Sequence, residues 1–202
     1  MKIIGFSGKK QSGKDTAVNN LYELLLTGSW SWSSVQLIYF AYFLKTIVKK
    51  CFDSDYAWGT DEDKNKILSC GKSTRELLQY LGTDIMRTLD PDCWIRAYKA
   101  TLAEFPDNTF ILTGDVRFPN EVRCIQELGG HVIRFLRSPF NDNHKSEMVL
   151  DGVEYDTAHS IAKNLGNSSE VILFDAIIDN TEMSITEQNE AVWKLVNERE
   201  WL

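Results

Sequence analysis

The stretch that decides the fold is Gly8-Lys9-Lys10-Gln11-Ser12-Gly13-Lys14-Asp15-Thr16. It follows residues 2–7 (KIIGFS), which are typical of a short buried strand, and precedes residues 14–26, whose apolar spacing predicts a helix. A glycine-rich turn between a strand and a helix can direct backbone N–H groups at a phosphate, and the positive end of the helix adds to the attraction. Lys14 would then reach the β- and γ-phosphates, so the stretch predicts a phosphate-binding loop.

The residue after Lys14 departs from the usual pattern of such loops, in which Ser or Thr follows the lysine and binds Mg²⁺. Here that residue is Asp15. Two arrangements stay open: Thr16 supplies the hydroxyl, or Asp15 meets the ion through water. For the whole stretch, the alternative is a glycine-rich turn whose lysines serve only solubility. The strand before it and the helix after it favour phosphate binding over that alternative.

The rest of the chain alternates between expected strands and expected helices. The strands are expected at residues 35–40, 109–114, 131–136 and 171–179, and the helices at 43–52, 74–89, 93–105, 119–128 and 185–200. This alternation predicts an α/β fold with a mostly parallel central sheet and helices on both faces. Two polar segments interrupt it: residues 53–72 are expected to form a mobile loop or cap, and residues 138–170 are the best candidate for a lid.

Two capping boxes mark the starts of helices, Ser73 with Glu76 and Ser184 with Glu187. The helix that Ser73 opens is strongly amphipathic, because its apolar residues recur at helical spacing. The side chains expected to face inward are Leu77, Leu78, Leu81, Ile85 and Leu89.

A polar stripe beside these apolar residues is a second candidate anion site. Its members recur every four positions: Arg75, Gln79, Thr83 and Arg87. Two guanidinium groups on one stripe suit a phosphate, whose oxygens match their fork geometry. Gly82 lies within the stripe and weakens the helix, which indicates the close approach of a ligand or of another backbone. The alternative is a solvated helix face with ion pairs, such as Arg75 with Asp84.

Charged residues also lie at or just after the ends of two of the expected strands. Asp115 and Arg117 come after the strand at 109–114, and ligands gather at the carboxyl ends of strands in doubly wound sheets. A carboxylate there can hold Mg²⁺ through water, and the alternative is a buried Asp–Arg pair that organises the loop. Arg134 and Arg137 lie at the mouth of the expected lid, where arginines can close over a transferring phosphoryl group.

The composition excludes several classes of protein. The chain has 202 residues and a net charge of −7, from 22 Lys and Arg against 29 Asp and Glu, which argues against a broad nucleic-acid-binding face. Its 4 cysteines are widely spaced, so neither a zinc site nor a disulfide framework is expected. No apolar run is long enough for a signal peptide or a membrane span, so a cytoplasmic protein is expected.

Several segments, in this order, resemble the phage-type deoxynucleoside monophosphate kinases, a branch of the P-loop nucleoside monophosphate kinase fold. They are GKKQSGKDT at 8–16, RELLQYLGTD at 75–84 with Trp94 beyond it, DVRFPNE at 115–121, VIRFLR at 132–137, NHKSE at 143–147 and IIDN at 177–180. The set covers nearly the whole chain, and the order of the segments is more specific than any one of them. The GKDT variant with Asp15 is itself typical of this group.

The resemblance implies a three-layer P-loop kinase fold with a lid insertion. It implies one domain over residues 1–202, with an acceptor-binding helical region at about 41–105 and a lid at about 138–170. The implied reaction transfers the γ-phosphate of ATP to a deoxynucleoside monophosphate, with Mg²⁺ as the cofactor, and gives a diphosphate and ADP. The acceptor phosphate is already an anionic nucleophile, so no general base is required.

The residue patterns and the resemblance together give each candidate residue a role. The expected ATP-binding residues are those of 8–16 and Arg137, and the expected metal ligands are Asp15, Thr16 and Asp115. The expected acceptor-binding residues are Lys45, Arg75, Gln79, Thr83, Asp84, Arg87, Trp94, Asp115, Arg117, His144 and Glu147. The expected catalytic residues are Lys14, Arg75, Arg117, Arg134 and Arg137. The resemblance places Arg134, Arg137 and the segment from His144 to Glu147 in the lid.

Two other functions stay open. One is a P-loop kinase of another phosphorylated small molecule, similar to the phosphomevalonate kinases of animals, and the other is a nucleotide-binding module or NTPase without an acceptor. An aromatic clamp on a base would favour a nucleotide, and Trp94, Tyr80 and Phe118 could supply it, although core packing is the alternative for each. The expected partners are small nucleotides rather than a nucleic-acid polymer or a membrane. A homodimer stays open, and a phage-encoded chain would act in the host cytoplasm.

Overall fold

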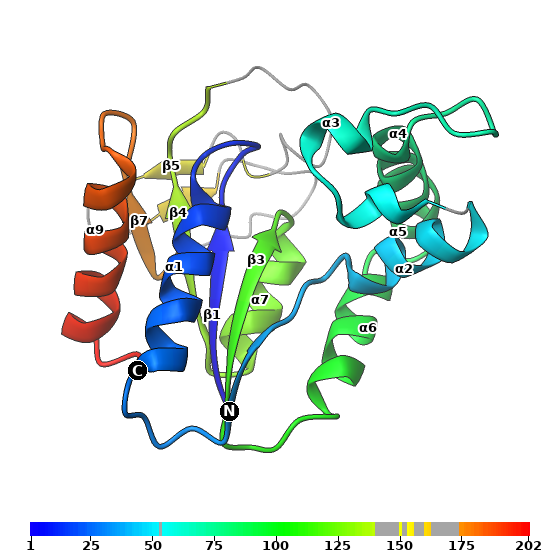
Figure 1. Ribbon diagram of the computed structural model, residues 1–202. Helices are drawn as coiled ribbons and strands as arrows, with labels where there is room; N and C mark the ends of the chain where they lie inside the picture. Colours follow the sequence, from blue (N-terminus) through cyan, green and yellow to red (C-terminus); the bar gives the residue numbers. More distant parts are fainter. Residues whose placement is uncertain (53, 140–149, 151–152, 156–159, 163–173) are drawn as a thin grey trace. The chain divides into compact units, whose positions relative to one another are not determined.

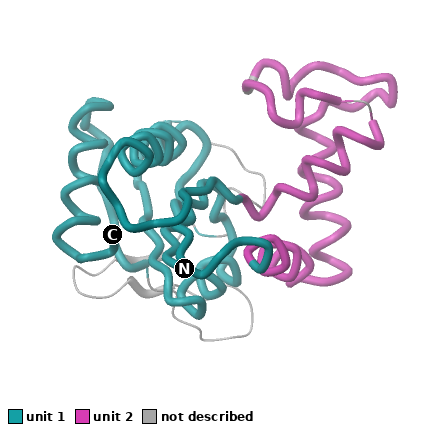
Figure 2. The backbone as a smooth tube through the Cα atoms, turned by 60° about the horizontal axis from the view of Figure 1, so that its bottom comes forward, with its two compact units in different colours: residues 1–38, 103–202 teal, residues 39–102 magenta. Residues whose placement is uncertain are grey.

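The chain forms two compact units. The computed structural model describes residues 1–52, 54–139, 150, 153–155, 160–162 and 174–202. Unit 1 comprises residues 1–38 and 103–202, and unit 2 comprises residues 39–102 (Figure 2). Unit 2 is therefore one continuous segment of chain, whereas unit 1 is assembled from two segments.

Unit 1 is built on a five-stranded sheet in which every pair of neighbouring strands is parallel (Figure 1). In spatial order the strands are β2 (Ser34–Leu37), β3 (Thr109–Val116), β1 (Lys2–Ser7), β4 (His131–Phe135) and β7 (Ala176–Ile178). β1 lies between β3 and β4, so the chain builds the sheet on one side of β1 and later on the other. The carboxyl end of β1 is thus the switch point of the sheet, the place where open α/β sheets bind ligands.

Helices cover both faces of this sheet, as the alternation in the sequence predicts. Ile4 and Phe6 of β1 pack into a core with α1 (Lys14–Thr27) and α9 (Ile185–Glu198), which lie side by side in Figure 1. Side chains alternate between the two faces of a strand. Gly5, which lies between Ile4 and Phe6, therefore faces the opposite side of the sheet. A Cβ on Gly5 would lie only 2.6 Å from Cδ1 of Ile125 in α7 (Pro119–Glu127), which covers that second face.

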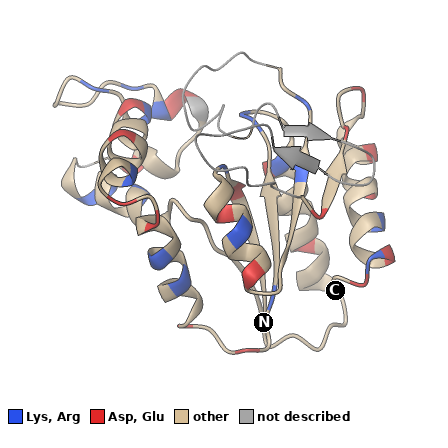
Figure 3. Cartoon of the chain, turned by 180° about the vertical axis from the view of Figure 1, so that it is seen from behind, with Lys and Arg blue, Asp and Glu red and all other residues tan. Residues whose placement is uncertain are grey.

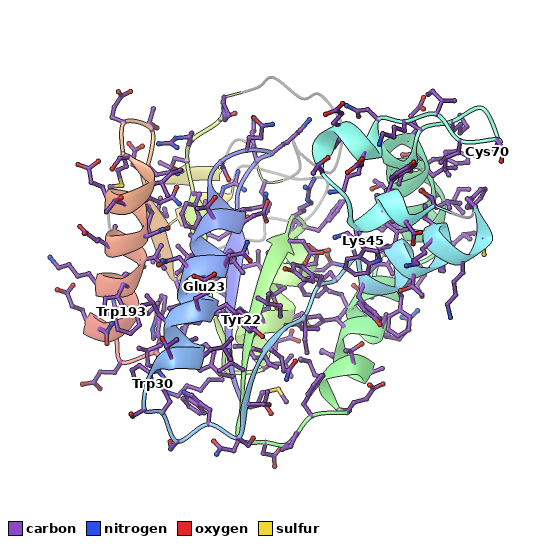
Figure 4. All side chains as sticks on the ribbon, viewed as in Figure 1. Tyr22, Glu23, Trp30, Lys45, Cys70 and Trp193 are labelled. Carbon is purple, nitrogen blue, oxygen red and sulfur yellow. The ribbon has the colours of Figure 1, made fainter. Side chains whose placement is uncertain are left out.

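Aromatic and backbone contacts tie the last residues of the chain to unit 1. The Nζ of Lys2 donates a hydrogen bond to the carbonyl of Leu202 at 2.7 Å, and the ring of Trp201 stacks on His131 with centroids 4.3 Å apart. Trp193 of α9 meets Trp30 edge-on, with centroids 6.2 Å apart; both are labelled in Figure 4. The final helix is therefore held firmly against the sheet, which matters for the site below.

The expected lid falls mostly outside the described residues. Within its range, β5 (Val153–Tyr155) and β6 (Ser160–Ala162) form an antiparallel pair. Strand β7 is shorter than the expected 171–179, of which residues 171–173 are not described. Of the helices in the described part of the chain, none has both the length and the apolar character that crossing a bilayer demands.

Unit 2 consists of short helical elements. They are α2 (Tyr42–Cys51), the 3₁₀ turn η1 (Asp55–Trp58), α3 (Asp61–Lys64), α4 (Thr74–Gln79), the π-helical segment η2 (Tyr80–Ile85), α5 (Met86–Leu89) and α6 (Cys93–Leu102). The segment 53–72, expected to be a loop or cap, therefore contains two short helical turns. The expected strand at 35–40 ends early, because the chain turns at Tyr39 to enter α2.

The helix expected at 74–89 changes its winding in the middle. A step of four residues overshoots one α-helical turn by about 40°, and the wider i→i+5 turn of η2 offsets this drift. Exposed side chains accordingly recur every four residues along it, at Glu76, Tyr80, Asp84 and Thr88. Leu77 is buried as expected, but Leu89 is 78% exposed. The expectation for Leu89 was wrong because it is the last residue of α5, where the chain leaves the helix.

Both predicted capping boxes are confirmed. At the start of α9 the Ser184 hydroxyl accepts a hydrogen bond from the Glu187 N–H at 3.2 Å, and the Glu187 carboxylate accepts from the Ser184 N–H at 2.8 Å. The Ser73–Glu76 pair repeats this arrangement at the start of α4. The hydrogen bonds from Ser184 lower the pKa of Glu187 below its usual value, because they favour the charged carboxylate.

A Glu187→Gln substitution should make the free energy of unfolding less dependent on pH. A carboxyl whose pKa is lowered in the folded state stabilises the protein above the pKa that it has when unfolded, and this contribution is lost as the pH falls through the folded value. The wild-type advantage over the variant should therefore be present at neutral pH and shrink in acid, measured by urea unfolding across the acidic range. Glu190→Gln on the same helix is the matched control, and an equal pH dependence of the two variants would contradict the role of the cap.

Candidate functional site

The loop that follows β1 has the backbone of an anion-binding turn. Gln11 and Gly13 both have positive φ angles, 57° and 91°. The Ser12 N–H closes the turn on the carbonyl of Lys9 at 3.1 Å, and α1 begins directly after Gly13. Successive N–H groups in such a turn converge on one point, and the first N–H groups of the helix lack acceptors within the helix. The predicted phosphate loop therefore has the geometry that its sequence indicates.

Lys14 is buried at the start of α1, where its side chain is 4% exposed. Its Nζ folds back over the loop, 3.3 Å from the carbonyl of Lys9, and lies 3.7 Å from the carboxylate of Asp15. Burial lowers the pKa of Lys14, and the positive charge of Arg117 lowers it further, while Asp15 and Asp115 oppose the shift. A cation held out of water next to an anion-binding turn gains the most when an anion takes the place of the lost solvent.

The neighbouring strands bring two of the predicted residues next to the loop. Ser7, the last residue of β1, pairs with Val116 of β3 and with Arg134 of β4. Asp115 precedes Val116, so it lies at the same end of the sheet. Arg134 is 6% exposed and donates from Nη1 to the Ser7 hydroxyl at 3.0 Å. Arg134 is therefore part of the sheet next to the loop, and its expected place in the lid was wrong because β4 includes it.

Glu121 is a residue of this region to which the sequence analysis gave no role. Its buried carboxylate, 2% exposed, accepts hydrogen bonds from the N–H groups of Arg117 and Phe118 at 2.7 and 3.0 Å. These bonds fix the turn between β3 and α7, and with it the backbone of Arg117. The signal was present in the sequence, since Glu121 lies three residues after the position that precedes Pro119, where a capping carboxylate belongs.

Arg137 is held by the segment that follows β7. Its backbone N–H donates to Oδ1 of Asn180 at 3.0 Å, and its guanidinium donates to the carbonyl of Met183. Asn180 is the last residue of the IIDN segment and is fully buried. The end of β4 is thereby linked to residues far along the chain.

The candidate metal ligands are few and accessible. Asp15 is 74% exposed at the side chain, Thr16 is exposed and Asp115 is half-buried. The described residues contain no group of three or more His, Cys, Asp or Glu side chains placed to hold a metal ion. This donor set fits Mg²⁺, which keeps several waters and binds through one or two carboxylates together with substrate phosphates.

The candidate acceptor-binding residues of the described chain, apart from Asp115 and Arg117, lie in unit 2. Lys45 of α2, labelled in Figure 4, lies over the rings of Trp58 and Tyr39, 4.6 and 5.2 Å from their centroids. On α4, Arg75 donates from Nε to the side chain of Asn65 at 3.0 Å. The remaining ones follow along the same helix: Gln79 ends α4, Thr83 and Asp84 are in η2, and Arg87 is in α5 with Nη1 3.2 Å from the carbonyl of Pro91.

The stripe from Arg75 to Arg87 remains on one side of the helix through η2. Arg75, Gln79 and Arg87 are half-buried, and Thr83 is 8% exposed, while the residues that follow Arg75, Gln79, Thr83 and Arg87 are all exposed. The four-residue period is therefore a property of the folded helix and not only of the sequence.

Trp94 lies in the core of unit 2. It is 5% exposed and packs with Leu44, Val48 and Leu77, and its indole Nε1 donates to the carbonyl of Gly82 at 2.9 Å. A Cβ on Gly82 would lie 2.4 Å from Cδ2 of Leu44. The close approach expected at Gly82 is thus made by a side chain of α2 rather than by another backbone. Core packing, the alternative given for Trp94, is what these contacts favour.

The remaining predicted positions, His144 and Glu147, lie outside the described residues. Within unit 1 the structure brings the loop of residues 8–16 together with Asp115, Arg117 and Arg134, because these residues share the carboxyl ends of neighbouring strands. An α/β sheet with this loop at the carboxyl end of its central strand defines a protein of the P-loop kinase fold.

Comparison with known proteins gives the family. The sequence profile described as deoxynucleotide monophosphate kinase matches residues 38–173. A protein of Acanthamoeba polyphaga mimivirus named "Putative deoxynucleotide monophosphate kinase" is 31% identical in an alignment 173 residues long, which covers 76% of this chain and 84% of that protein. The chain belongs to the deoxynucleotide monophosphate kinase family and is an enzyme of the phosphotransferase class. The phosphate loop lies before the range that the profile matches, so its geometry is a separate observation.

Replacing Trp94 by Phe should loosen η2. The substitution removes the donor to a buried carbonyl at Gly82, which should lower the free energy of unfolding by about 1–3 kcal/mol. Amide hydrogen exchange in a peptide covering residues 80–85 should become faster, because that hydrogen bond restrains the wide turn. Ile95→Val, which shortens a buried neighbour on α6 without removing a hydrogen bond, is the control; equal exchange in both variants would refute the link between Trp94 and η2.

Proposed function

We propose that the chain transfers the γ-phosphate of ATP to a deoxynucleoside monophosphate. Membership of the family means that the chain phosphorylates deoxynucleotide monophosphates. The proposal adds that ATP is the phosphate donor. The observation that carries this addition is the loop of residues 8–16, with two positive φ angles and a buried lysine at a helix N-terminus. Such a turn binds the phosphates of a nucleoside triphosphate through backbone N–H groups.

Lys14 is proposed as the main charge at the donor phosphates. Its Nζ already lies over the loop, so little reorganisation is needed when the β- and γ-phosphates bind. Arg117 and Arg134 come from the ends of β3 and β4 and add positive charge near the same point, and Arg137 is proposed for the donor side as well. These cations offset the negative charge that the γ-phosphoryl group carries during transfer.

Mg²⁺ is proposed as the cofactor, with Asp15, Thr16 and Asp115 as its ligands, directly or through water. The bound ion would supply charge neutralisation at the donor phosphates. Asp15 is exposed and Asp115 is half-buried, and one or two such carboxylates together with substrate phosphates are the ligands that Mg²⁺ takes.

The acceptor is proposed to bind through Lys45 and the stripe on α4, η2 and α5. Two arginines on one side of a helix can hold the acceptor phosphate in a fixed orientation. An oxygen of this phosphate attacks the γ-phosphorus, the bond to the oxygen that bridges the β- and γ-phosphorus atoms breaks, and ADP leaves with the electron pair. The attacking oxygen carries no proton to remove, so positioning and charge are what the protein must supply.

Small nucleotides, and not a nucleic-acid polymer, are proposed as the partners. Figure 3 shows acidic and basic positions interspersed along the described helices of each unit. A polymer-binding face would need a continuous basic surface, whereas a small substrate needs only the local cluster around the phosphate loop.

A Lys14→Ala variant should lose transfer while keeping its fold. The buried cation touches the reacting phosphates in this proposal, so kcat/KM should fall by about 100-fold or more. ADP release coupled to a spectrophotometric readout measures the rate, and circular dichroism checks the fold. Lys194→Ala, on the exposed side of α9, is the control and should keep wild-type activity. Near-normal turnover in Lys14→Ala would refute the donor site.

The same assay identifies the acceptor. With ATP as donor, ADP release should depend on a deoxynucleoside monophosphate, tested against ribonucleoside monophosphates, phosphomevalonate and a reaction without acceptor. Release at the same rate without any acceptor would indicate an NTPase, and release with phosphomevalonate alone would indicate a kinase of another small molecule.

A further inference from the structure

Two buried amide side chains from outside the phosphate loop hold it from behind. Asn180, which follows β7, is 0% exposed, and Gln188 of α9 is 1% exposed. Nδ2 of Asn180 donates to the carbonyl of Ser12 at 2.6 Å and to Oε1 of Gln188 at 2.5 Å. Nε2 of Gln188 donates to the carbonyl of Gly13 at 3.0 Å. Two consecutive carbonyls of the loop are thus each held by a side-chain amide.

We infer that Asn180 and Gln188 are positioning residues for the donor phosphates, an inference that rests on the donor site proposed above. A peptide bond is planar and trans, so its carbonyl and its N–H point in opposite directions. The carbonyl of Ser12 shares a plane with the N–H of Gly13, and the carbonyl of Gly13 shares one with the N–H of Lys14. Holding the two carbonyls on one side therefore aims the two N–H groups at the other side, where the phosphates bind.

The packing of Gln188 also explains why residue 13 must be glycine. A Cβ on Gly13 would lie 2.2 Å from Oε1 of Gln188, and the φ angle of 91° is one that side chains disfavour. The loop backbone and the amide of α9 therefore touch directly. A bulkier residue at either position would push the loop away from α9 and turn its N–H groups.

Asn180 connects this support to a second element of the site. Its Oδ1 accepts the N–H of Arg137, while its Nδ2 reaches Ser12 and Gln188. One amide thus sets the loop, the start of α9 and the end of β4 relative to one another. Both side chains are neutral, so they fix the loop without cancelling the positive charge that the phosphates meet.

The first test separates positioning from stability. Gln188→Met keeps a side chain of similar size but removes both hydrogen bonds. Val196→Ala, two turns further along the buried side of α9, is the matched control, because Val196 is 0% exposed and lies in the core away from the loop. Urea unfolding shows whether the two variants are destabilised to a similar extent.

Gln188→Met should weaken the binding of Mg²⁺-ATP about tenfold, the loss expected from one or two hydrogen bonds. The KM for the deoxynucleoside monophosphate should stay close to its wild-type value, since Gln188 acts on the donor loop. Val196→Ala should keep wild-type affinity for Mg²⁺-ATP. Equal donor affinity in the two variants, or an equal effect on donor and acceptor, would overturn the inference.

Gln188→Glu adds a readout that a purely structural role would not give. A protonated carboxyl can still donate to the carbonyl of Gly13, whereas a carboxylate repels it. Donor binding by this variant should therefore improve as the pH is lowered, relative to wild type at each pH. A constant ratio across the pH range would contradict the proposed hydrogen bond.

Hydrogen exchange without nucleotide keeps this inference distinct from the proposed function. A peptide covering residues 8–16 should exchange faster in Gln188→Met than in wild type or Val196→Ala. If wild type does not bind Mg²⁺-ATP, the proposed donor site fails, and the exchange rates alone decide whether Gln188 holds the loop. Unchanged exchange in Gln188→Met would overturn the inference whatever the outcome for ATP.

Discussion

A buried cation beside a tight turn is the constraint on which the rest of unit 1 depends. Removing the Lys14 ammonium from water costs free energy, and the carboxylates of Asp15 and Asp115 offset only part of that cost. Without a bound anion, contacts within the protein must keep the turn in its conformation. The buried strand β1, the N-terminus of α1 and the amides of Asn180 and Gln188 supply them.

The switch point of the sheet brings charged side chains close to the loop. Because β3 and β4 flank β1, side chains from their ends reach the loop without long excursions of the chain. The ends of these two strands carry Asp115, Arg117 and Arg134. The buried carboxylate of Glu121 fixes the turn in which Arg117 lies. Charge near the loop is therefore built on strand ends, which are more rigid than surface loops.

Short sequence patterns predicted the features of the fold that depend on residues close together in the chain. The strand, turn and helix over residues 2–27, both capping boxes and the alternation of strands and helices depend on residues close to one another in the chain, and the structure confirms them. Phosphate binding by the turn stays a prediction. The wide turn of η2, the burial of Trp94 and the exposure of Leu89 depend on contacts within the folded unit 2. The sequence also contains a signal for Gln188, because Gln188, Val192 and Val196 recur every four residues on the buried side of α9. A polar residue on an apolar face indicates that it has a partner, but not which one.

The distance along the chain between the loop and its supports has a consequence for biosynthesis. Asn180 and Gln188 follow Ser12 and Gly13 by 168 and 175 residues. A chain that emerges from the ribosome with β1 and α1 complete still lacks both amides, and gains them only when β7 and α9 have been made. A ligand of the loop would therefore stabilise the folded unit 1 by mass action, but not a chain in which α9 is still to be made. Until α9 is made, β1 and α1 therefore rely on their own packing to hold the turn between them.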